Sequence, residues 1–152
     1  NTCTQCYRYF TQHDPSIELC PICHDPSRDD SQLMIVEKDV DLDNIERSGA
    51  YRGRYFVLGG TVPILDQNPA DRVRIKDLKS IIHKSQATEV ILALSANPDG
   101  DHTSDYVTSE LNASGGEKNL RISKLGRGLS TGSELEYSDP DTIRNALVNR
   151  SD

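Results

Sequence analysis

Short apolar runs separated by polar segments recur after residue 30 and predict an alternation of strands and helices. Leu33-Met34-Ile35-Val36 is one such run and ends on Glu37, while Val90 to Leu94 is a second, almost fully apolar run. Continuous apolar runs of this length are typical of strands that are buried on both faces, as in a parallel sheet covered by helices. Segments 51–58 and 120–125 also have strand character, so we expect four strands.

Helical spacing appears between these runs. Over residues 74–85 the apolar side chains recur every three or four positions and predict an amphipathic helix. We expect further helices over 41–47, ended by Gly49, over 102–112, and after Asp139, which is a typical N-cap followed by Pro140. Residues 61–72 read as a loop. Strands alternating with helices predict a small α/β domain with a mainly parallel sheet.

All four cysteines lie in the first 23 residues, as Cys3-x-x-Cys6 and Cys20-x-x-Cys23. Two thiolates two residues apart can bind one ion from a tight turn, and two such pairs supply the tetrahedral sulfur set that Zn²⁺ prefers. The remaining 129 residues contain no cysteine. The pattern therefore predicts a structural zinc site in a small module.

Three alternatives to zinc each fit part of the cysteine pattern. Two disulfides would suit a secreted mini-domain, but the long cysteine-free remainder is unlike such scaffolds. Cys20-Pro21-Ile22-Cys23-His24 matches the haem-attachment pattern, which would leave Cys3 and Cys6 without a role. Iron in a rubredoxin-like site is chemically reasonable. Zinc remains the preferred interpretation.

The residues around the cysteines suggest how so small a module is held. We expect the aromatic side chains of Tyr7, Tyr9 and Phe10 to cover the metal site, because the module is too small to bury a core of its own. Stacking of Tyr7 or Tyr9 on nucleic acid is the functional alternative. We expect His24 to be solvated and not to bind the metal.

Acidic side chains follow the two apolar strands. Glu37 ends the first strand, and Asp99-Gly100-Asp101 follows the second. Ligands gather at the carboxyl ends of parallel strands, and two Asp residues around a Gly can direct both carboxylates at one hard cation. The sequence thus indicates a Mg²⁺ site. A strand-end acid and an ordinary turn with a helix cap are the structural alternative.

Composition narrows the choice of partners. The 152 residues contain 24 acids and 17 Lys and Arg, a formal net charge of -7, which excludes indiscriminate polycationic DNA binding. Any DNA contact must use local basic patches, for which the candidates are Arg52, Arg54, Lys124 and Arg127. Residues 25–46 are acidic and suit a protein partner or a cation. The longest apolar run is too short for a membrane helix, so we expect a soluble, cytoplasmic chain.

Several blocks of the chain resemble the bacterial RecR family of recombination mediators. The four-cysteine finger runs into Leu33 to Glu37 and then into Tyr51-Arg52-Gly53-Arg54-Tyr55-Phe56-Val57-Leu58-Gly59-Gly60. The closing stretch agrees in order and spacing, with Arg127-Gly128-Leu129, Gly132-Ser133-Glu134-Leu135-Glu136-Tyr137, Asp139 and Thr142-Ile143-Arg144-Asn145-Ala146-Leu147. The resemblance covers nearly the whole chain.

The resemblance implies a zinc finger over residues 1–28, a Toprim domain over 29–128 and a C-terminal segment with a closing helix over 129–152. The Toprim acids would be Glu37, Asp99 and Asp101, where the family more often has Glu-Gly-Glu in a longer loop. Ser130 stands where the family usually has Pro. The family also carries a helix-hairpin-helix segment before the finger, so we expect these residues to be part of a longer protein.

The resemblance implies a non-enzymatic mediator of DNA repair and recombination in the bacterial cytoplasm, associated with the nucleoid. Such proteins form oligomers that range from dimers to tetrameric rings. They bind RecO and RecF and help load RecA on gapped DNA. The four cysteines would hold zinc, and the Toprim acids would dock a basic partner or Mg²⁺. The alternative is a Mg²⁺-dependent Toprim enzyme, a nuclease or a topoisomerase or primase fragment, although Tyr106 and Tyr137 look structural and not nucleophilic.

Overall fold

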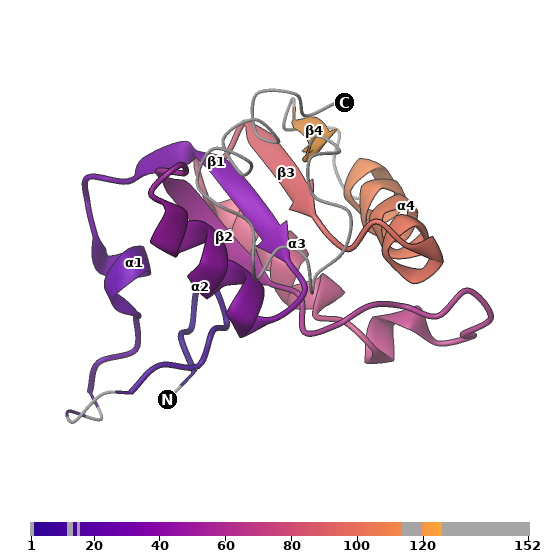
Figure 1. The fold of residues 1–152 in the computed structure, drawn as a ribbon, viewed down its shortest axis with the longest axis horizontal. Helices are drawn as coiled ribbons and strands as arrows, with labels where there is room; N and C mark the ends of the chain where they lie inside the picture. Colours follow the sequence, from indigo (N-terminus) through magenta and orange to yellow (C-terminus); the bar gives the residue numbers. More distant parts are fainter. Residues whose placement is uncertain (1, 12–13, 15, 114–119, 126–152) are drawn as a thin grey trace.

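The part of the chain that the structure describes forms a four-stranded sheet flanked by helices on both faces (Figure 1). The computed structural model describes residues 2–11, 14, 16–113 and 120–125. The strands are β1 (Asp29–Val36), β2 (Gly53–Val57), β3 (Glu89–Ala93) and β4 (Arg121–Lys124), all parallel and in the order β2-β1-β3-β4. The four expected strands and the parallel sheet are confirmed.

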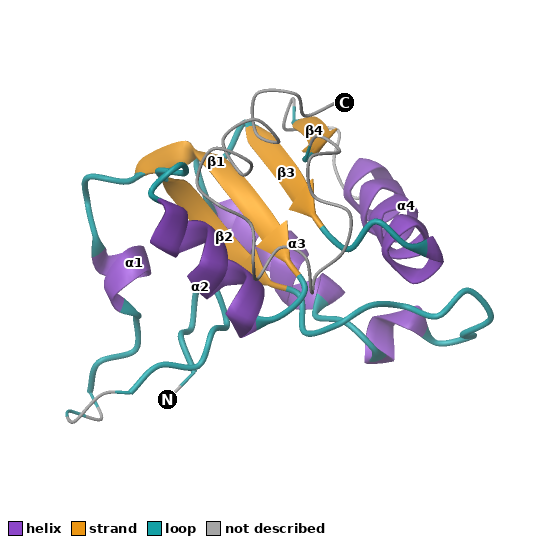
Figure 2. Ribbon diagram, viewed as in Figure 1, coloured by secondary structure: helices purple, strands orange, loops and turns teal. Residues whose placement is uncertain are grey.

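Helices cover both faces of this sheet (Figure 2). They are α2 (Asp39–Ser48), α3 (Ile75–Lys84) and α4 (Pro98–Ala113). The short helix α1 (Pro21–His24) belongs to the four-cysteine module and lies beside the edge strand β2 (Figure 1), and the described residues also form a 3₁₀ turn, η1 (Pro69–Asp71), in the loop between β2 and α3. On one face, Met34 and Val36 of β1 pack in one buried cluster with Leu42 of α2. On the other face, Leu33 and Ile35 pack with the apolar stripe of α3 and with α4. The alternation of β1 side chains therefore supplies both cores.

Helix ends follow local sequence signals. Gly49 ends α2 in the left-handed region at φ 70°, as its position predicted. The start of α4, expected near His102, is wrong: the helix begins at Pro98. The side chain of Asn97 accepts the Gly100 N–H at 2.8 Å and so acts as an N-cap, while proline suits the first helical turn. The helix expected after Asp139 lies outside the described residues.

Candidate metal centre and acidic edge

The four cysteine side chains meet at one point. Their Sγ atoms all lie within 4.8 Å of one another, the side chains are buried, and all four are free thiols. The Cys6 and Cys20 Sγ atoms are 3.7 Å apart, far beyond the roughly 2.05 Å of a disulfide. Sulfurs about 2.3 Å from one zinc ion at tetrahedral angles would be about 3.8 Å apart. The donor set therefore fits zinc, and the disulfide alternative does not match the geometry.

Backbone hydrogen bonds shape both cysteine turns. The Tyr7 N–H donates to the Cys3 carbonyl at 3.0 Å, and the His24 N–H donates to the Cys20 carbonyl at 3.0 Å. Tyr7 itself is in the left-handed region, at φ 65°, where the first turn closes. The Cys20 N–H also points at Cys3 Sγ, 3.4 Å away, which stabilises negative charge on that sulfur. His24 is exposed and outside the cluster, as expected.

The thiols distribute their protons unevenly. Hydrogen bonding from Cys23 lowers the pKa of Cys20 to about 6, and the same contact with Cys20 raises the pKa of Cys23. Contact with Cys20 likewise raises the pKa of Cys6. Crowded thiols cannot all ionise without a cation, so metal binding here must release protons. Zinc, when bound, would supply the positive charge that holds four thiolates together.

Only one of the three aromatic side chains covers the metal site as predicted. Phe10 is buried in the same cluster as the cysteines. Tyr7 instead packs against Phe56, with ring centroids 5.5 Å apart, and lies under the guanidinium of Arg74 at 5.4 Å. Tyr9 is 64% exposed. The residue spacing did not distinguish these three orientations, because they depend on how the finger meets the sheet.

The finger is joined to the edge strand β2. The Val57 N–H donates to the Cys6 carbonyl at 2.8 Å, where the next strand of a larger sheet would bond. Nη1 of Arg54 donates to the carbonyls of Ile22 and Cys23, at 2.8 and 3.0 Å, and Nε pairs with Asp30 at 2.8 Å. The cysteines belong to the same buried cluster as β1, β2 and α2. Finger and sheet thus form one packed unit.

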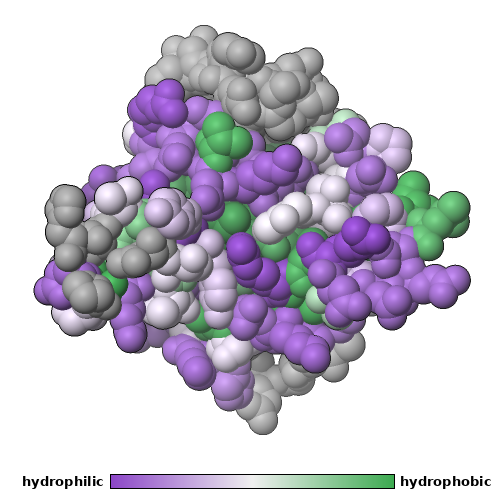
Figure 3. All heavy atoms as spheres, turned by 90° about the horizontal axis from the view of Figure 1, so that it is seen from below, coloured by the Kyte–Doolittle hydropathy of each residue, from purple (hydrophilic) through white to green (hydrophobic). Residues whose placement is uncertain are grey.

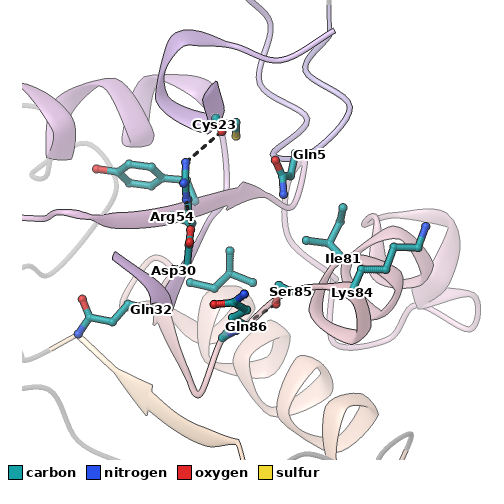
Figure 4. Close-up of a pocket in the computed structure, with 12 residues that line it drawn as sticks. Gln5, Cys23, Asp30, Gln32, Arg54, Ile81, Lys84, Ser85 and Gln86 are labelled. Carbon is teal, nitrogen blue, oxygen red and sulfur yellow. Dashed lines mark hydrogen bonds and ion pairs between the residues drawn. The ribbon is translucent and has the colours of Figure 1, made fainter. Parts of the chain in front are cut away.

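A cavity of about 280 Å³ lies beside this junction. Figure 4 shows Arg54 reaching from β2 toward Cys23 while it contacts Asp30, with Gln5 of the finger on one side and Lys84 at the end of α3 on the other. The cavity is on the side of the sheet where β1 begins, away from the acidic residues at the strand ends. It marks the seam between finger, β2 and α3.

Glu37 follows β1 at the carboxyl edge of the sheet. Its Oε1 accepts the Ser95 N–H at 2.7 Å, and its carbonyl accepts the Gly59 N–H at 2.9 Å. The residue therefore links the exits of β1, β2 and β3. Figure 3 views the molecule from the side toward which these strands run, a mainly hydrophilic face with a few hydrophobic patches. On the loop after β2, Leu65 is 91% exposed.

Asp99 and Asp101 lie in the first turn of α4 and are exposed. They were expected in a loop that could direct both carboxylates at one ion. Residues two apart in a helix point to different sides, so the helix separates them. Within the described part of the chain, the four cysteines form the only group of three or more His, Cys, Asp or Glu residues whose ligand atoms lie close enough together to hold one metal ion. Direct ligation of one cation by Glu37, Asp99 and Asp101 together stays a prediction.

Gly100 explains why the acids flank a glycine. A Cβ atom at this position would lie 1.8 Å from the Ser95 carbonyl oxygen. The first turn of α4 therefore packs directly against the chain leaving β3, and only glycine permits this approach. Because Ser95 also donates to Glu37, Gly100 helps hold the helix start next to the acidic edge.

The candidate DNA contacts fall in different settings. Arg52 is exposed, and Lys124 lies 3.9 Å from Asp105 on an exposed surface. The Arg54 guanidinium is occupied by the Ile22 and Cys23 carbonyls and by Asp30. No feature of the sequence indicates these contacts. Arg127 is outside the described residues. DNA contact by these residues stays a prediction.

Comparison with known proteins shows which family models and relatives the chain matches. Residues 31–125 match the Toprim domain model, and residues 128–151 match the model for the RecR C-terminal region. The recombination protein RecR of Syntrophobacter fumaroxidans is 38% identical over 149 residues, 98% of this chain and 70% of the relative. The chain belongs to the RecR family. RecR of Chloroflexus aggregans is 37% identical over 97% of the chain and 68% of the relative. RecR of Bifidobacterium longum subsp. infantis is 41% identical over 86% of the chain and 64% of the relative.

Membership of the RecR family implies a role in DNA recombination and repair. It agrees with the architecture, in which a four-cysteine cluster precedes a Toprim sheet. Among the residues that the structure describes, no helix is both long and apolar enough to cross a membrane. The resemblance seen in the sequence is confirmed by these relatives.

Proposed function

We propose that this RecR-family chain is a non-enzymatic mediator that assembles as a clamp-like oligomer and works with RecO and RecF type proteins to load RecA on gapped DNA. The observation that carries the proposal is the match over nearly the whole chain to relatives named recombination protein RecR. The finger would act structurally, since its cysteines share a core with the Toprim sheet. No step of this role needs a bond to be made or broken by the chain.

The acidic edge is the proposed docking site. Glu37 follows β1, and Asp99 and Asp101 lie in the first turn of the helix that follows β3, so all three residues lie near the carboxyl ends of the strands, and a basic surface on a RecO-type partner would complement their charge. Mg²⁺ could occupy the same edge through water molecules, because this ion retains much of its hydration shell. The separation of Asp99 and Asp101 on the first turn of α4 supports docking over a tight two-metal centre.

Binding to the cognate RecO tests the proposal. Glu37→Gln and the double variant Asp99→Asn with Asp101→Asn should each weaken binding at least about tenfold if these charges meet the partner at close range. Asp105→Asn is the matched control, since it removes one exposed acid from the same helix away from the sheet edge. Equal affinities for wild type and all variants would refute docking at this edge.

The enzyme alternative is tested separately. Incubation of the chain with Mg²⁺ and gapped or single-stranded DNA should leave the DNA intact. Cleavage that disappears in the Glu37→Gln variant would replace the mediator role with metal-dependent phosphoryl chemistry.

A further inference from the structure

A second cavity, of about 240 Å³, lies where the finger meets the carboxyl edge of the sheet. We call it the junction pocket. Its walls are contributed by the finger, by the exit of β1 and start of α2, and by the segments that flank the loop after β2. The side chains and backbone that line it belong to Thr2, Tyr7, Tyr9, Glu37, Lys38, Asp39, Val57, Gly59 and Arg74.

Tyr9 is the unusual member of this set. Its ring is 64% exposed, although its neighbours along the chain are anchored: Arg8 pairs with Asp43 at 2.7 Å, and Phe10 is buried. The Tyr9 backbone is also held, by an antiparallel bridge to Thr2 and by its N–H donating to Asp39 at 3.2 Å. The fold therefore holds a largely exposed aromatic residue, with an anchored backbone, in the lining of a pocket, which is a preorganised arrangement.

The charges around Tyr9 suit a ligand with a neutral aromatic ring inside the pocket and an anionic group outside it. Glu37 and Asp39 each accept a backbone N–H, and Arg74 is occupied by the Val57 carbonyl at 2.9 Å and by the Tyr7 ring. Lys38 is exposed. An unpaired nucleobase has the flat face that stacks on tyrosine, and its phosphate requires a cation in reach.

We propose that the junction pocket is a binding site for one unpaired base of single-stranded DNA, stacked on Tyr9 with an adjacent phosphate at Lys38. Tyr7 is excluded as the platform because its ring already packs on Phe56 and Arg74. The site is independent of base identity, since every base offers a π-face. The inference rests on the proposed function in one respect, that DNA is the nucleic acid on which the chain works.

The test uses fluorescence anisotropy with a short labelled single-stranded oligonucleotide, at low salt, and the full chain. Tyr9→Ala should weaken binding at least about fivefold, the lower end for one stacked base, while Tyr9→Phe should bind like wild type. Ile17→Ala is the control, because it truncates another exposed apolar side chain of the finger outside the pocket. An oligonucleotide with abasic sites should bind weakly and should not distinguish wild type from Tyr9→Ala.

Lys38→Ala tests the phosphate contact. It should lower the affinity for intact and abasic strands alike and reduce the salt dependence of binding by about one phosphate contact. Zinc content and melting temperature should match wild type in the Tyr9 and Lys38 variants, which separates a local effect from misfolding. RecO binding should also be unchanged in Tyr9→Ala.

Three results would overturn the site. The first is equal affinity of wild type and Tyr9→Ala for the intact strand. The second is a loss of affinity in Tyr9→Ala that is as large for the abasic strand as for the intact strand. Either result would mean that Tyr9 does not stack on a base. The third is loss of RecO binding with DNA binding unchanged, which would make Tyr9 a protein contact. Because RecO affinity is measured separately, failure of DNA stacking leaves the mediator proposal to its own experiment.

Discussion

Replacing one zinc ligand should destabilise the sheet as well as the finger. Cys20→Ser removes a sulfur from a cluster that packs with Met34, Val36 and Leu42 in one core. Structural zinc contributes about 10–16 kcal/mol of apparent binding free energy in isolated fingers, comparable to the roughly 5–15 kcal/mol that stabilises a whole domain. Loss of a metal site is among the mutations that cost more than about 4 kcal/mol.

For a chain of this size, each kcal/mol shifts the melting temperature by about 2–4 °C. Cys20→Ser should therefore lower it by at least about 8 °C, measured by circular dichroism, and should lower the zinc content measured after acid release. His24→Ala is the matched control, because His24 is adjacent to the ligand Cys23 yet exposed and outside the cluster. A Cys20→Ser protein that keeps one zinc per chain and the wild-type melting temperature would refute a structural metal site joined to the core.

Two further predictions concern the sheet and its surface. Gly100→Ala should destabilise the chain by about 1–3 kcal/mol, because the new Cβ would meet the Ser95 carbonyl oxygen. The change is measured from the urea midpoint, with Ser109→Ala on the same helix as a control that should change little. Equal midpoints for Gly100→Ala and wild type would contradict the close approach. Hydrogen bonds from Ser27 and Ser31 lower the pKa values of Asp25 and Asp29 in the folded state. This stability is present above about pH 4 and is lost as pH falls through the folded pKa values. The double variant Asp25→Asn with Asp29→Asn should lose less stability between pH 6 and pH 3 than wild type; parallel urea midpoints across that range would contradict the assignment.

The exposed loop after β2 and the junction pocket show how the fold separates two kinds of surface. Leu65 is exposed on the loop, whereas Tyr9 lines a cavity whose lining also includes charged residues. Both are large exposed side chains, but Tyr9 also has a backbone held by Thr2 and Asp39 and contributes to the lining of a pocket. The anchored backbone and the pocket favour Tyr9 over Leu65 as the site for a stacked base.

Much of the architecture was readable from the chain alone because its causes are local. Apolar runs marked β1 and β3, the helical spacing of apolar residues marked α3, and Gly49 marked the end of α2. The prediction for the start of α4 is four residues too late, because Asn97-Pro98 acts as a cap and first helical residue and not as part of a loop. The four-cysteine cluster was also predictable, since its ligands come in two short motifs whose spacing is itself the geometric requirement.

Tertiary structure decided everything that depends on which segments meet. Nothing in the local sequence indicates that the finger bonds to the edge of β2. The contacts of Arg54 with the finger carbonyls and of Arg74 with Tyr7 and the Val57 carbonyl could therefore not be predicted from the sequence. The same contact sends Phe10 into the core, Tyr7 onto Phe56 and Tyr9 into solvent. Periodicity reports whether a side chain is buried along one element, whereas a site is built where separate elements converge. The sequence alone therefore determined the sheet and the metal ligands, and packing of the finger on the sheet decided the junction pocket.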